Sequence, residues 1–396
     1  MKITTEMMRN TTLLLLLLLF ASACNTAQKS NEEKWSIKMA DAVMERYDTL
    51  AYYNGRNIAG WSYDVALVGM AIDQLGEADP KYSAYMKTYM DMLVESDGSI
   101  PRYDMNKFNI DYINPAKNII TLYERSGEEK YLNALPQFIE QMEQHPKTES
   151  GGYWHKKIYP WQIWLDGVYM GMPFLTRYAK SFDQPQWFDV ATHEIILTYE
   201  KTLDPETCLL YHAWDESKEQ RWADPETGKS PHFWSRAMGW YVMALVDVLD
   251  DLPEDHSDRT EIISILNKTI DALLKVRDET SGCWYQVLDQ GGREGNYLEG
   301  SGTAMYIYAM AKGANKGYLD KSYLEVANKA FDDMIETFII TDEDQLPSMI
   351  NICGSCGLGG KPYRDGSYEY YTTERIVKND SKGVGPFILA ARELNR

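Results

Sequence analysis

Hydrophobic residues along the chain recur with the spacing of α-helices, and almost no stretch alternates as a β-strand would. Two kinds of helical segment follow each other. One kind is amphipathic and opens after a short turn that carries an aromatic residue, whereas the other is mostly apolar and rich in small residues. Because an amphipathic helix covers a surface and an apolar helix is buried among its neighbours, the pattern predicts alternating outer and inner helices.

The predicted helices pair into hairpins. The apolar segments are residues 61–76, 111–127, 164–180, 234–250, 298–314 and 383–395. The amphipathic segments are residues 35–50, 79–90, 126–135, 183–191, 256–266 and 319–327. Six such hairpins are typical of an all-α (α/α)6 barrel, although an open α-solenoid also stacks repeated helix pairs. Long irregular loops and glycines in the inner helices favour the closed barrel.

The N-terminal residues have the pattern of an export signal. Lys2 and Arg9 precede the apolar run 11–20, which is too short to remain as a membrane anchor. Small residues follow and end at a cysteine, as in a bacterial lipobox. An ordinary secretion signal without a lipid is the alternative. We therefore expect an exported protein, either periplasmic or anchored to a membrane as a bacterial lipoprotein.

The same pattern divides the chain. Residues 1–23 are predicted to be a lipoprotein signal peptide, with Cys24 as the lipidated N-terminus. Residues 24–34 are predicted to be a polar tether, and residues 35–396 a single barrel domain. A net charge of −19 argues against nucleic acid and anionic membrane surfaces as partners, so the lipid is the only membrane contact expected. An anionic ligand would need its own local cluster of Arg, Lys or His.

Cys353 and Cys356 form a C-x-x-C pair in a glycine-rich loop. The sequence has no second pair of this spacing and no βαβ pattern around it, so zinc binding or redox chemistry is less favoured than a pair of loop cysteines. In an oxidising compartment such cysteines can be joined by a disulfide. We expect no metal and no other cofactor.

A barrel of this kind gathers polar residues at one end. All inner helices run in the same direction, so their N-termini and the preceding loops meet at one mouth, where a pocket is expected. The residues placed there are Tyr63, Asp64, Asp111, His155, Lys156, Trp164, Asp166, His212, Trp234, Arg236, Glu299, Ser301, Arg364 and residues 381–383.

Two acids open inner helices of the predicted barrel, Asp166 within an aromatic and aliphatic run and Asp111 in the preceding hairpin. One possibility is that each acid has a purely structural role as a helix cap, because an aspartate at a helix start accepts backbone N–H bonds. The alternative is acid–base chemistry. Trp161 and Trp164 are expected to raise the pKa of Asp166 by desolvation, whereas the helix N-terminus is expected to lower it. Two carboxylates across a mouth would suit glycoside hydrolysis, in which their separation decides the outcome.

Arg236 is the side chain best suited to bind a carboxylate, because a guanidinium can form two parallel hydrogen bonds with it. His155 and His212 lie too far apart in sequence for a metal motif and are better suited as donors to a sugar or a carboxylate. Tryptophan rings either belong to the core or stack on a sugar face at the mouth. The pocket therefore suits an acidic sugar. The tryptophans concerned are Trp154, Trp164, Trp214, Trp234 and Trp240.

Several motifs resemble one known family. They are WLDGVYMGMPFL, HFWSRAMGWY, SGTAMY, GLGGKPYRDGSYEYY and GVGPFILA, and the resemblance extends from Trp61 to the C-terminus. The family is that of the unsaturated rhamnogalacturonyl hydrolases, glycoside hydrolase family 105. The resemblance implies an (α/α)6 barrel that releases a 4,5-unsaturated uronic acid from the non-reducing end of oligosaccharides made by polysaccharide lyases. Rhamnogalacturonan or pectin is then the expected parent polysaccharide.

The resemblance also implies a role for each site residue. The aspartate of the family's W-x-D-G motif protonates C4 of the enol ether, water adds at C5, and the resulting hemiketal opens; it corresponds to Asp166. The second predicted catalytic acid, which holds sugar hydroxyls, corresponds to Asp111. A related family 88 enzyme acting on glycosaminoglycan fragments, and a non-catalytic glycan-binding lipoprotein, are the alternatives. The predicted substrate-binding residues are Tyr63, His155, Lys156, Trp164, His212, Trp234, Arg236 and Trp240.

Overall fold

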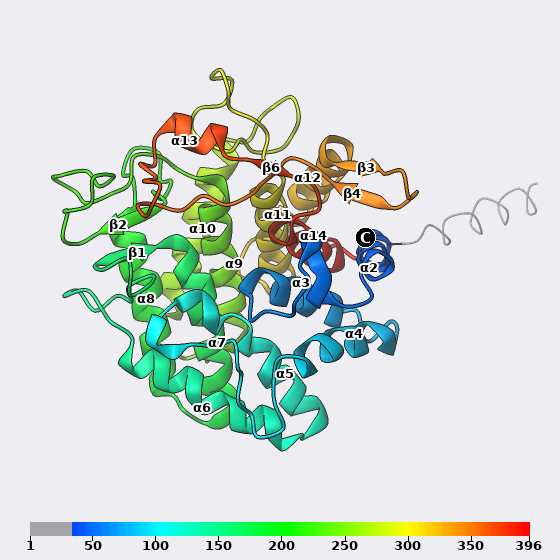
Figure 1. Ribbon diagram of the computed structural model, residues 1–396. Helices are drawn as coiled ribbons and strands as arrows, with labels where there is room; N and C mark the ends of the chain where they lie inside the picture. Colours follow the sequence, from blue (N-terminus) through cyan, green and yellow to red (C-terminus); the bar gives the residue numbers. More distant parts are fainter. Residues whose placement is uncertain (1–33) are drawn as a thin grey trace, which may run out of the picture.

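The computed structural model describes residues 34–396, and helices make up most of this part of the chain. The predicted signal peptide and Cys24 lie outside the described residues. Figure 1 looks along two concentric rings of helices. The inner ring contains α3 (Tyr63–Asp73), α5 (Ala116–Ser126), α7 (Leu165–Phe182), α9 (Ser235–Asp251), α11 (Gly300–Lys316) and α14 (Ser381–Glu393). The outer ring contains α2 (Trp35–Arg46), α4 (Pro80–Asp91), α6 (Glu129–Gln144), α8 (Gln186–Thr202), α10 (Arg259–Lys275) and α12 (Tyr323–Phe338).

The inner ring is closed. Each inner helix packs against the next one along the chain, and the last, α14, packs against the first, α3. The backbone N–H of Ser36 also donates to the carbonyl of Arg396 at 3.0 Å, which joins the two ends of the described chain. An open solenoid leaves its terminal repeats apart, so the prediction of an (α/α)6 barrel is confirmed.

Small residues let the inner helices approach one another closely. A Cβ added at Gly302 on α11 would lie only 2.1 Å from the Oγ atom of Ser235 on α9. A side chain there would force Ser235 to shift, and the backbone carbonyl carbon of Ser235 would still lie only 3.1 Å from the added Cβ. The glycines of the apolar segments therefore serve helix packing, as expected for a closed barrel.

The start of one inner helix differs from the prediction. Asp111 was expected to open the second apolar segment, but α5 begins only at Ala116. Asp111 instead belongs to η3, a 3-10 turn at Ile110–Ile113. The cause is Pro115, because it has no N–H to donate to the carbonyl of Asp111 and its ring would clash with that carbonyl in an α-helix. Two further 3-10 segments, η1 (Leu50–Gly55) and η2 (Met105–Lys107), lie in the loops.

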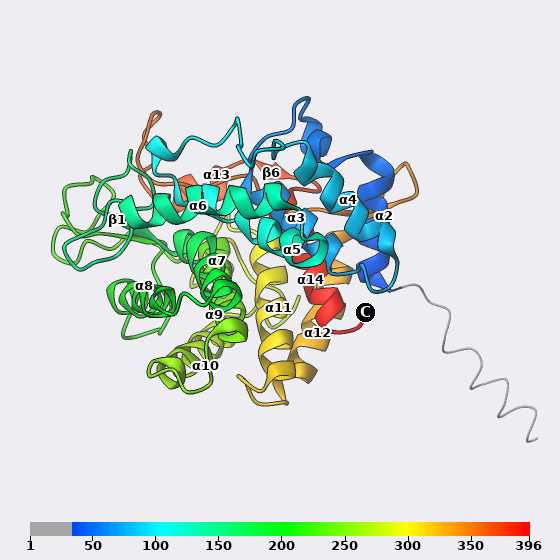
Figure 2. The ribbon, with the colours of Figure 1, turned by 90° about the horizontal axis from the view of Figure 1, so that it is seen from below.

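Short strands and one short helix lie in the loops of the barrel and were not predicted. The strands have only two or three residues, which are too few to show alternation. They gather in the long loops, and Figure 2 shows α13 (Tyr368–Thr373) at one end of the barrel, with the far ends of α10 and α12 at the other. Among residues 34–396, no helix is long and apolar enough to cross a membrane. The antiparallel pairs are β1 (Gln162–Trp164) with β2 (Ala213–Asp215), β3 (Ile339–Thr341) with β4 (Pro347–Met349), and β5 (Ile352–Cys353) with β6 (Ile376–Val377).

Candidate active site

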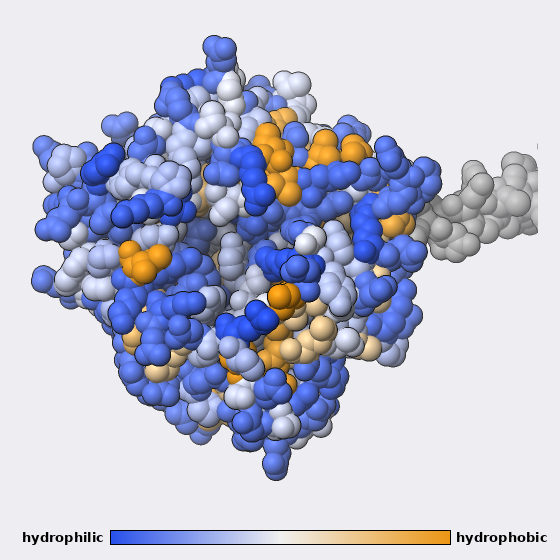
Figure 3. Space-filling model, in the orientation of Figure 1, coloured by the Kyte–Doolittle hydropathy of each residue, from blue (hydrophilic) through white to orange (hydrophobic). Residues whose placement is uncertain are grey.

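A narrow pocket of about 70 Å³ lies at the mouth predicted from the topology. The face of the barrel that carries the long loops is mostly hydrophilic and is hollowed near its centre (Figure 3). Most of the predicted site residues meet in this pocket, together with a wall formed by the loop after β5. Its lining consists of Tyr63, Asp111, His155, Lys156, Tyr159, Trp164, Asp166, Met170, Trp234, Arg236, Ser355, Cys356, Gly357 and Arg364.

The β1–β2 pair positions Asp166. Trp164 at the end of β1 pairs with Ala213, and the N–H of Leu165 donates to the carbonyl of His212 at 3.1 Å. Asp166 follows in the first turn of α7, where the helix has no side-chain cap. Its Oδ2 atom is buried and forms no hydrogen bond within the described residues, and lies 3.4 Å from Nε2 of His212. The helix-cap role considered for Asp166 is therefore not the one that the structure shows.

The structure decides between the two opposing effects expected on the pKa of Asp166. Burial does penalise its charged form, as expected from the nearby Trp164. However, the imidazoles of His212 and His155 and the guanidinium of Arg236 outweigh burial and hold the pKa of Asp166 below its ordinary value. The sequence had left the direction of the pKa shift open between desolvation and the helix N-terminus, because it did not reveal that three nitrogen-bearing side chains face Asp166.

Asp111 is held by the two residues that follow Trp154. The N–H of Ile110 donates to the carbonyl of His155 at 3.2 Å and so brings the 3-10 turn beside this loop. Nζ of Lys156 lies 2.7 Å from Asp111 Oδ2, and Nε2 of His155 lies 3.5 Å from Oδ1. Burial would lower the pKa of Lys156, but the Asp111 carboxylate raises it, so Lys156 remains a cation.

His155 is a neutral neighbour of both acids. Burial lowers its pKa to about 4 despite the opposing effect of Asp111, so its ring is uncharged near pH 7. The ring stacks on Trp164, with centroids 4.4 Å apart. The glycine after Asp166 leaves room for this ring, because a Cβ at Gly167 would lie 3.2 Å from Nδ1 of His155, closer than most such contacts, and would push the ring away by a few tenths of an ångström. Both residues of the Asp-Gly pair thus contribute to the pocket.

Arg236 lines the pocket from the start of α9. Its guanidinium donates to the backbone carbonyls of Cys353 and Gly354, and its Nε atom is buried without a partner in the described part of the chain. The sulfur atoms of Cys353 and Cys356 are 3.4 Å apart and unbonded, so the disulfide considered for this loop is not formed in the structure. The loop instead braces the guanidinium through its carbonyl groups.

Two of the predicted binding residues do not line the pocket. His212 is fully buried behind Asp166, and Trp240 lies deeper in the barrel, where its ring stacks on Tyr169 with centroids 5.0 Å apart. Asp64, which had been placed at the rim, has a structural role. It accepts hydrogen bonds from Arg56 at 3.1 Å and from Ser381 at 2.6 Å, and so ties α3 to α14.

Tyr159 belongs to the site and was missed. Its ring stacks on Trp164 with centroids 4.9 Å apart, and its hydroxyl accepts a hydrogen bond from Arg364 at 2.8 Å. Tyr159 comes from an irregular loop without any repeating pattern, and its only signal in the sequence is its closeness to the His-Lys pair. Ser355, Cys356 and Gly357 were missed for the same reason, whereas Met170 lies on α7, where an apolar residue gives no sign that it faces a pocket.

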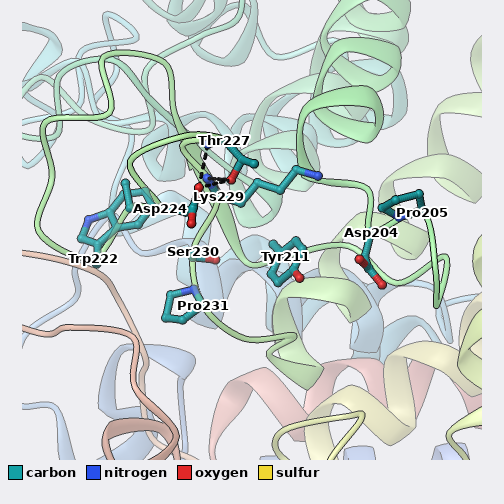
Figure 4. Close-up of a pocket in the computed structure, with 10 residues that line it drawn as sticks. Asp204, Pro205, Tyr211, Trp222, Asp224, Thr227, Lys229, Ser230 and Pro231 are labelled. Atoms are coloured by element: carbon teal, nitrogen blue, oxygen red, sulfur yellow. Dashed lines mark hydrogen bonds between the residues drawn. The ribbon is translucent and has the colours of Figure 1, made fainter.

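A wider hollow of about 570 Å³ lies in the loop between α8 and α9. Figure 4 shows Tyr211, Lys229 and Asp204 around it, while the Asp224 carboxylate is occupied by a turn that Thr227 closes. None of the predicted site residues lines this hollow, so its size does not make it the reaction site. Among residues 34–396, no group of three or more His, Cys, Asp or Glu side chains is placed so that it could hold a metal ion.

Comparisons with known proteins agree with this geometry. A sequence model described as Glycosyl Hydrolase Family 88 matches residues 35–396. A solved structure of a family 105 glycoside hydrolase from C. acetobutylicum ATCC 824 superposes with a TM-score of 0.88 and 46% identity, covering 92% of this chain and 99% of that one. Protein Atu3128 of Agrobacterium fabrum is 38% identical over 230 residues, which cover 57% of this chain and 97% of that protein. The unsaturated rhamnogalacturonyl hydrolase YesR of Bacillus subtilis is 25% identical over 282 residues, which cover 70% of this chain and 76% of YesR.

The closed double ring of helices and the acid-containing pocket at its mouth define a glycoside hydrolase of the (α/α)6 class. The chain belongs to the group formed by glycosyl hydrolase families 88 and 105, the unsaturated glycuronyl hydrolases. Its motifs had indicated the family 105 branch, and the likeness to the clostridial enzyme over nearly the whole length confirms that resemblance.

Proposed function

We propose that this hydrolase removes the 4,5-unsaturated uronic acid from rhamnogalacturonan- or pectin-derived oligosaccharides, with Asp166 as the catalytic acid. One observation carries the assignment of the residue. Asp166 lines the pocket, yet its buried Oδ2 atom has no hydrogen bond within the described chain and caps no helix. A buried carboxylate oxygen without a structural partner is costly, and such groups are found where chemistry requires them. The substrate class follows from the likeness to YesR.

The chemistry needs only one principal acid. In the enol ether of the unsaturated sugar, Asp166 gives its proton to C4, and a water molecule adds to the cation that develops at C5. Asp166 then accepts a proton from this water, so the carboxyl group is restored. The hemiketal at C5 opens and the glycosidic bond to the next sugar is lost. Asp111 and Lys156, already paired at 2.7 Å, are placed to hold sugar hydroxyls.

The low pKa of Asp166 in the unliganded pocket sets a condition on this reaction. The free site stabilises the carboxylate, whereas the first step needs the carboxylic acid. The substrate supplies the difference, because a bound uronate near Arg236 offsets the positive charge that lowers the pKa. Binding of the anionic sugar and protonation of Asp166 are therefore coupled.

The test uses the ultraviolet absorbance of the unsaturated uronate, which disappears when the double bond is hydrated. Fragments from lyase-digested pectin, ulvan and chondroitin are incubated with the wild type, with Asp166→Asn and with Asp183→Asn, an exposed residue at the other end of α7. The wild type and Asp183→Asn should bleach pectin fragments, and Asp166→Asn should be at least about a hundredfold slower. An active Asp166→Asn contradicts the assigned role. Bleaching of chondroitin fragments alone would instead favour the glycosaminoglycan substrate of a family 88 enzyme.

We also propose that the protein is exported as a lipoprotein through Cys24. The support is the basic, apolar and small-residue order of residues 1–23. Metabolic labelling with a fatty acid should mark the wild type and leave Cys24→Ala unlabelled. Equal labelling of both proteins contradicts lipidation at this cysteine.

A further inference from the structure

A tyrosine that the reaction scheme does not use lies behind the catalytic acid. The hydroxyl of Tyr371 on α13 is 2.7 Å from Nδ1 of His212. On the other side of the same ring, Nε2 of His212 is 3.4 Å from Oδ2 of Asp166. Tyr371 and His212 are both fully buried. The three side chains therefore form a line that ends at the proposed proton donor, although they lie far apart in sequence.

The direction of the hydrogen bond between Tyr371 and His212 follows because the hydroxyl of Tyr371 has one acceptor within reach. Burial raises the pKa of Tyr371 well above its ordinary value, so the phenol keeps its proton. His212 is the one hydrogen-bond partner that this hydroxyl has in residues 34–396. A buried O–H without an acceptor costs free energy, so the hydroxyl donates to Nδ1. When the imidazole carries one hydrogen, this hydrogen is then on Nε2, which faces Asp166.

The surroundings of Tyr371 fix its hydroxyl in place. Its backbone carbonyl accepts a hydrogen bond from Nε2 of Gln286 at 3.0 Å, and its ring stacks on Trp234 with centroids 6.1 Å apart. The indole N–H of Trp234 donates in turn to Oε1 of Gln286 at 3.1 Å. Tyr371 is thus anchored to a residue that lines the pocket, and a stable hydrogen-bond direction is expected.

We propose that Tyr371 is a positioning residue that fixes the tautomer of His212 with its hydrogen on Nε2, so that Oδ2 of Asp166 faces a donor and Oδ1 carries the proton to the substrate. This assignment rests on the proposed role of Asp166. The separation of 3.4 Å is longer than a usual hydrogen bond, and catalytic contacts commonly shorten in the substrate complex. With the hydrogen on Nδ1 instead, the lone pair of Nε2 would face Oδ2 and compete for the proton needed at C4.

The tautomer can be measured in the free protein. The chain has six histidines, so ¹⁵N-histidine labelling gives few signals, and His212→Gln identifies the one that belongs to His212. Wild-type protein should show the Nε2–H tautomer. Tyr371→Phe should lose it in favour of a mixture or of the Nδ1–H form. Tyr368→Phe is the matched control, because this tyrosine on the same short helix donates to the backbone carbonyls of Arg293 and Glu294 and does not touch His212.

The kinetic test separates positioning from folding. Tyr371→Phe should lower kcat about tenfold or more with little change in KM, and the limb of the pH profile that reports Asp166 should move to higher pH because its donor is lost. Tyr368→Phe should keep the wild-type profile. An Nδ1–H tautomer in the wild type, or an unchanged tautomer and kcat in Tyr371→Phe, overturns the proposal. A wild type that is inactive on every substrate refutes the proposed function instead, and the tautomer measurement then still decides the contact.

Discussion

Glu194 gives the fold a pH dependence that can be measured. Its side chain is 2% exposed on α8, and its only hydrogen bond within residues 34–396 comes from the backbone N–H of Tyr153 at 2.9 Å. Burial raises the pKa of Glu194 to about 7 from an ordinary value of 4.5, although the Tyr153 N–H and the nearby Lys147 oppose this rise. We predict that Glu194→Gln stabilises the protein above neutral pH.

The sign and size follow from linkage. Because the folded protein holds the proton of Glu194 more tightly than the unfolded chain does, the free energy of unfolding falls as the pH rises from about 4.5 to about 7. A pKa rise of about 2.5 units corresponds to about 3 kcal/mol, which is fully lost above about pH 7. Glutamine can accept the same N–H bond from Tyr153 and carries no charge. The wild type should therefore lose about 2 kcal/mol more than Glu194→Gln between pH 5 and pH 8.

Urea denaturation followed by tryptophan fluorescence at pH 5, 6, 7 and 8 measures this difference. Glu200→Gln is the control, because Glu200 is an exposed glutamate on the same helix and should leave the pH dependence as in the wild type. Parallel pH curves for the wild type and Glu194→Gln would refute the reasoning, because they would mean that Glu194 titrates alike in the folded and unfolded chains.

Three further substitutions or substrates test other charges of the molecule. Burial lowers the pKa of Lys117 to about 8 from 10.5, so the stability of the wild type should rise by about 3 kcal/mol between pH 8 and 10.5, and Lys117→Met should remove this rise in urea titrations. Although burial would raise the pKa of Asp64, its basic and hydroxyl partners lower it from 3.8 to about 2. Asp64→Asn should thus lower the free energy of unfolding by about 2 kcal/mol at pH 7, and this loss should vanish as the pH falls through 2. A urea midpoint equal to that of the wild type at pH 7 would contradict this prediction. A methyl ester of the unsaturated uronide should be hydrated at least tenfold more slowly than the free acid by the wild type in the absorbance assay, since it brings no charge to raise the pKa of Asp166; equal rates would contradict the coupling.

The helices could be predicted because their signals are local. The apolar segment predicted at residues 234–250 is α9, found at Ser235–Asp251, since one uninterrupted period marks it. The position of Asp111 was less accurate, because Pro115 cannot donate a hydrogen bond to the carbonyl of Asp111 and so delays the helix. The 3-10 turn that replaces the first helical turn is what allows the chain to pair with His155.

The lining of the pocket could be predicted from the barrel topology, which places the starts of the inner helices and the loops between helices at one mouth. Asp166 and Arg236 lie at such starts, and His155, Lys156 and Arg364 lie in such loops. Tyr159 and Tyr371 reach the site from irregular loops or a short helix, and their partners are set by tertiary packing. The same limit explains why the direction of the pKa shift of Asp166 stayed open, since it depends on side chains from three other parts of the chain.

The charge distribution explains why an acidic protein can select an acidic sugar. The net charge of −19 repels anions at long range, but screening at physiological salt confines that repulsion to about 8 Å from each charge. Within the pocket, Lys156 and Arg236 provide the local positive charge that an anionic ligand was expected to need, and His155 adds a neutral donor. Arg236, together with the imidazoles of His212 and His155, also holds the pKa of Asp166 below its ordinary value, so under the proposed mechanism a ligand that offsets the charge of Arg236 favours the acid form. Under the proposed mechanism a neutral sugar could enter the pocket and still not react, and selectivity for uronates therefore resides in the chemical step as much as in binding.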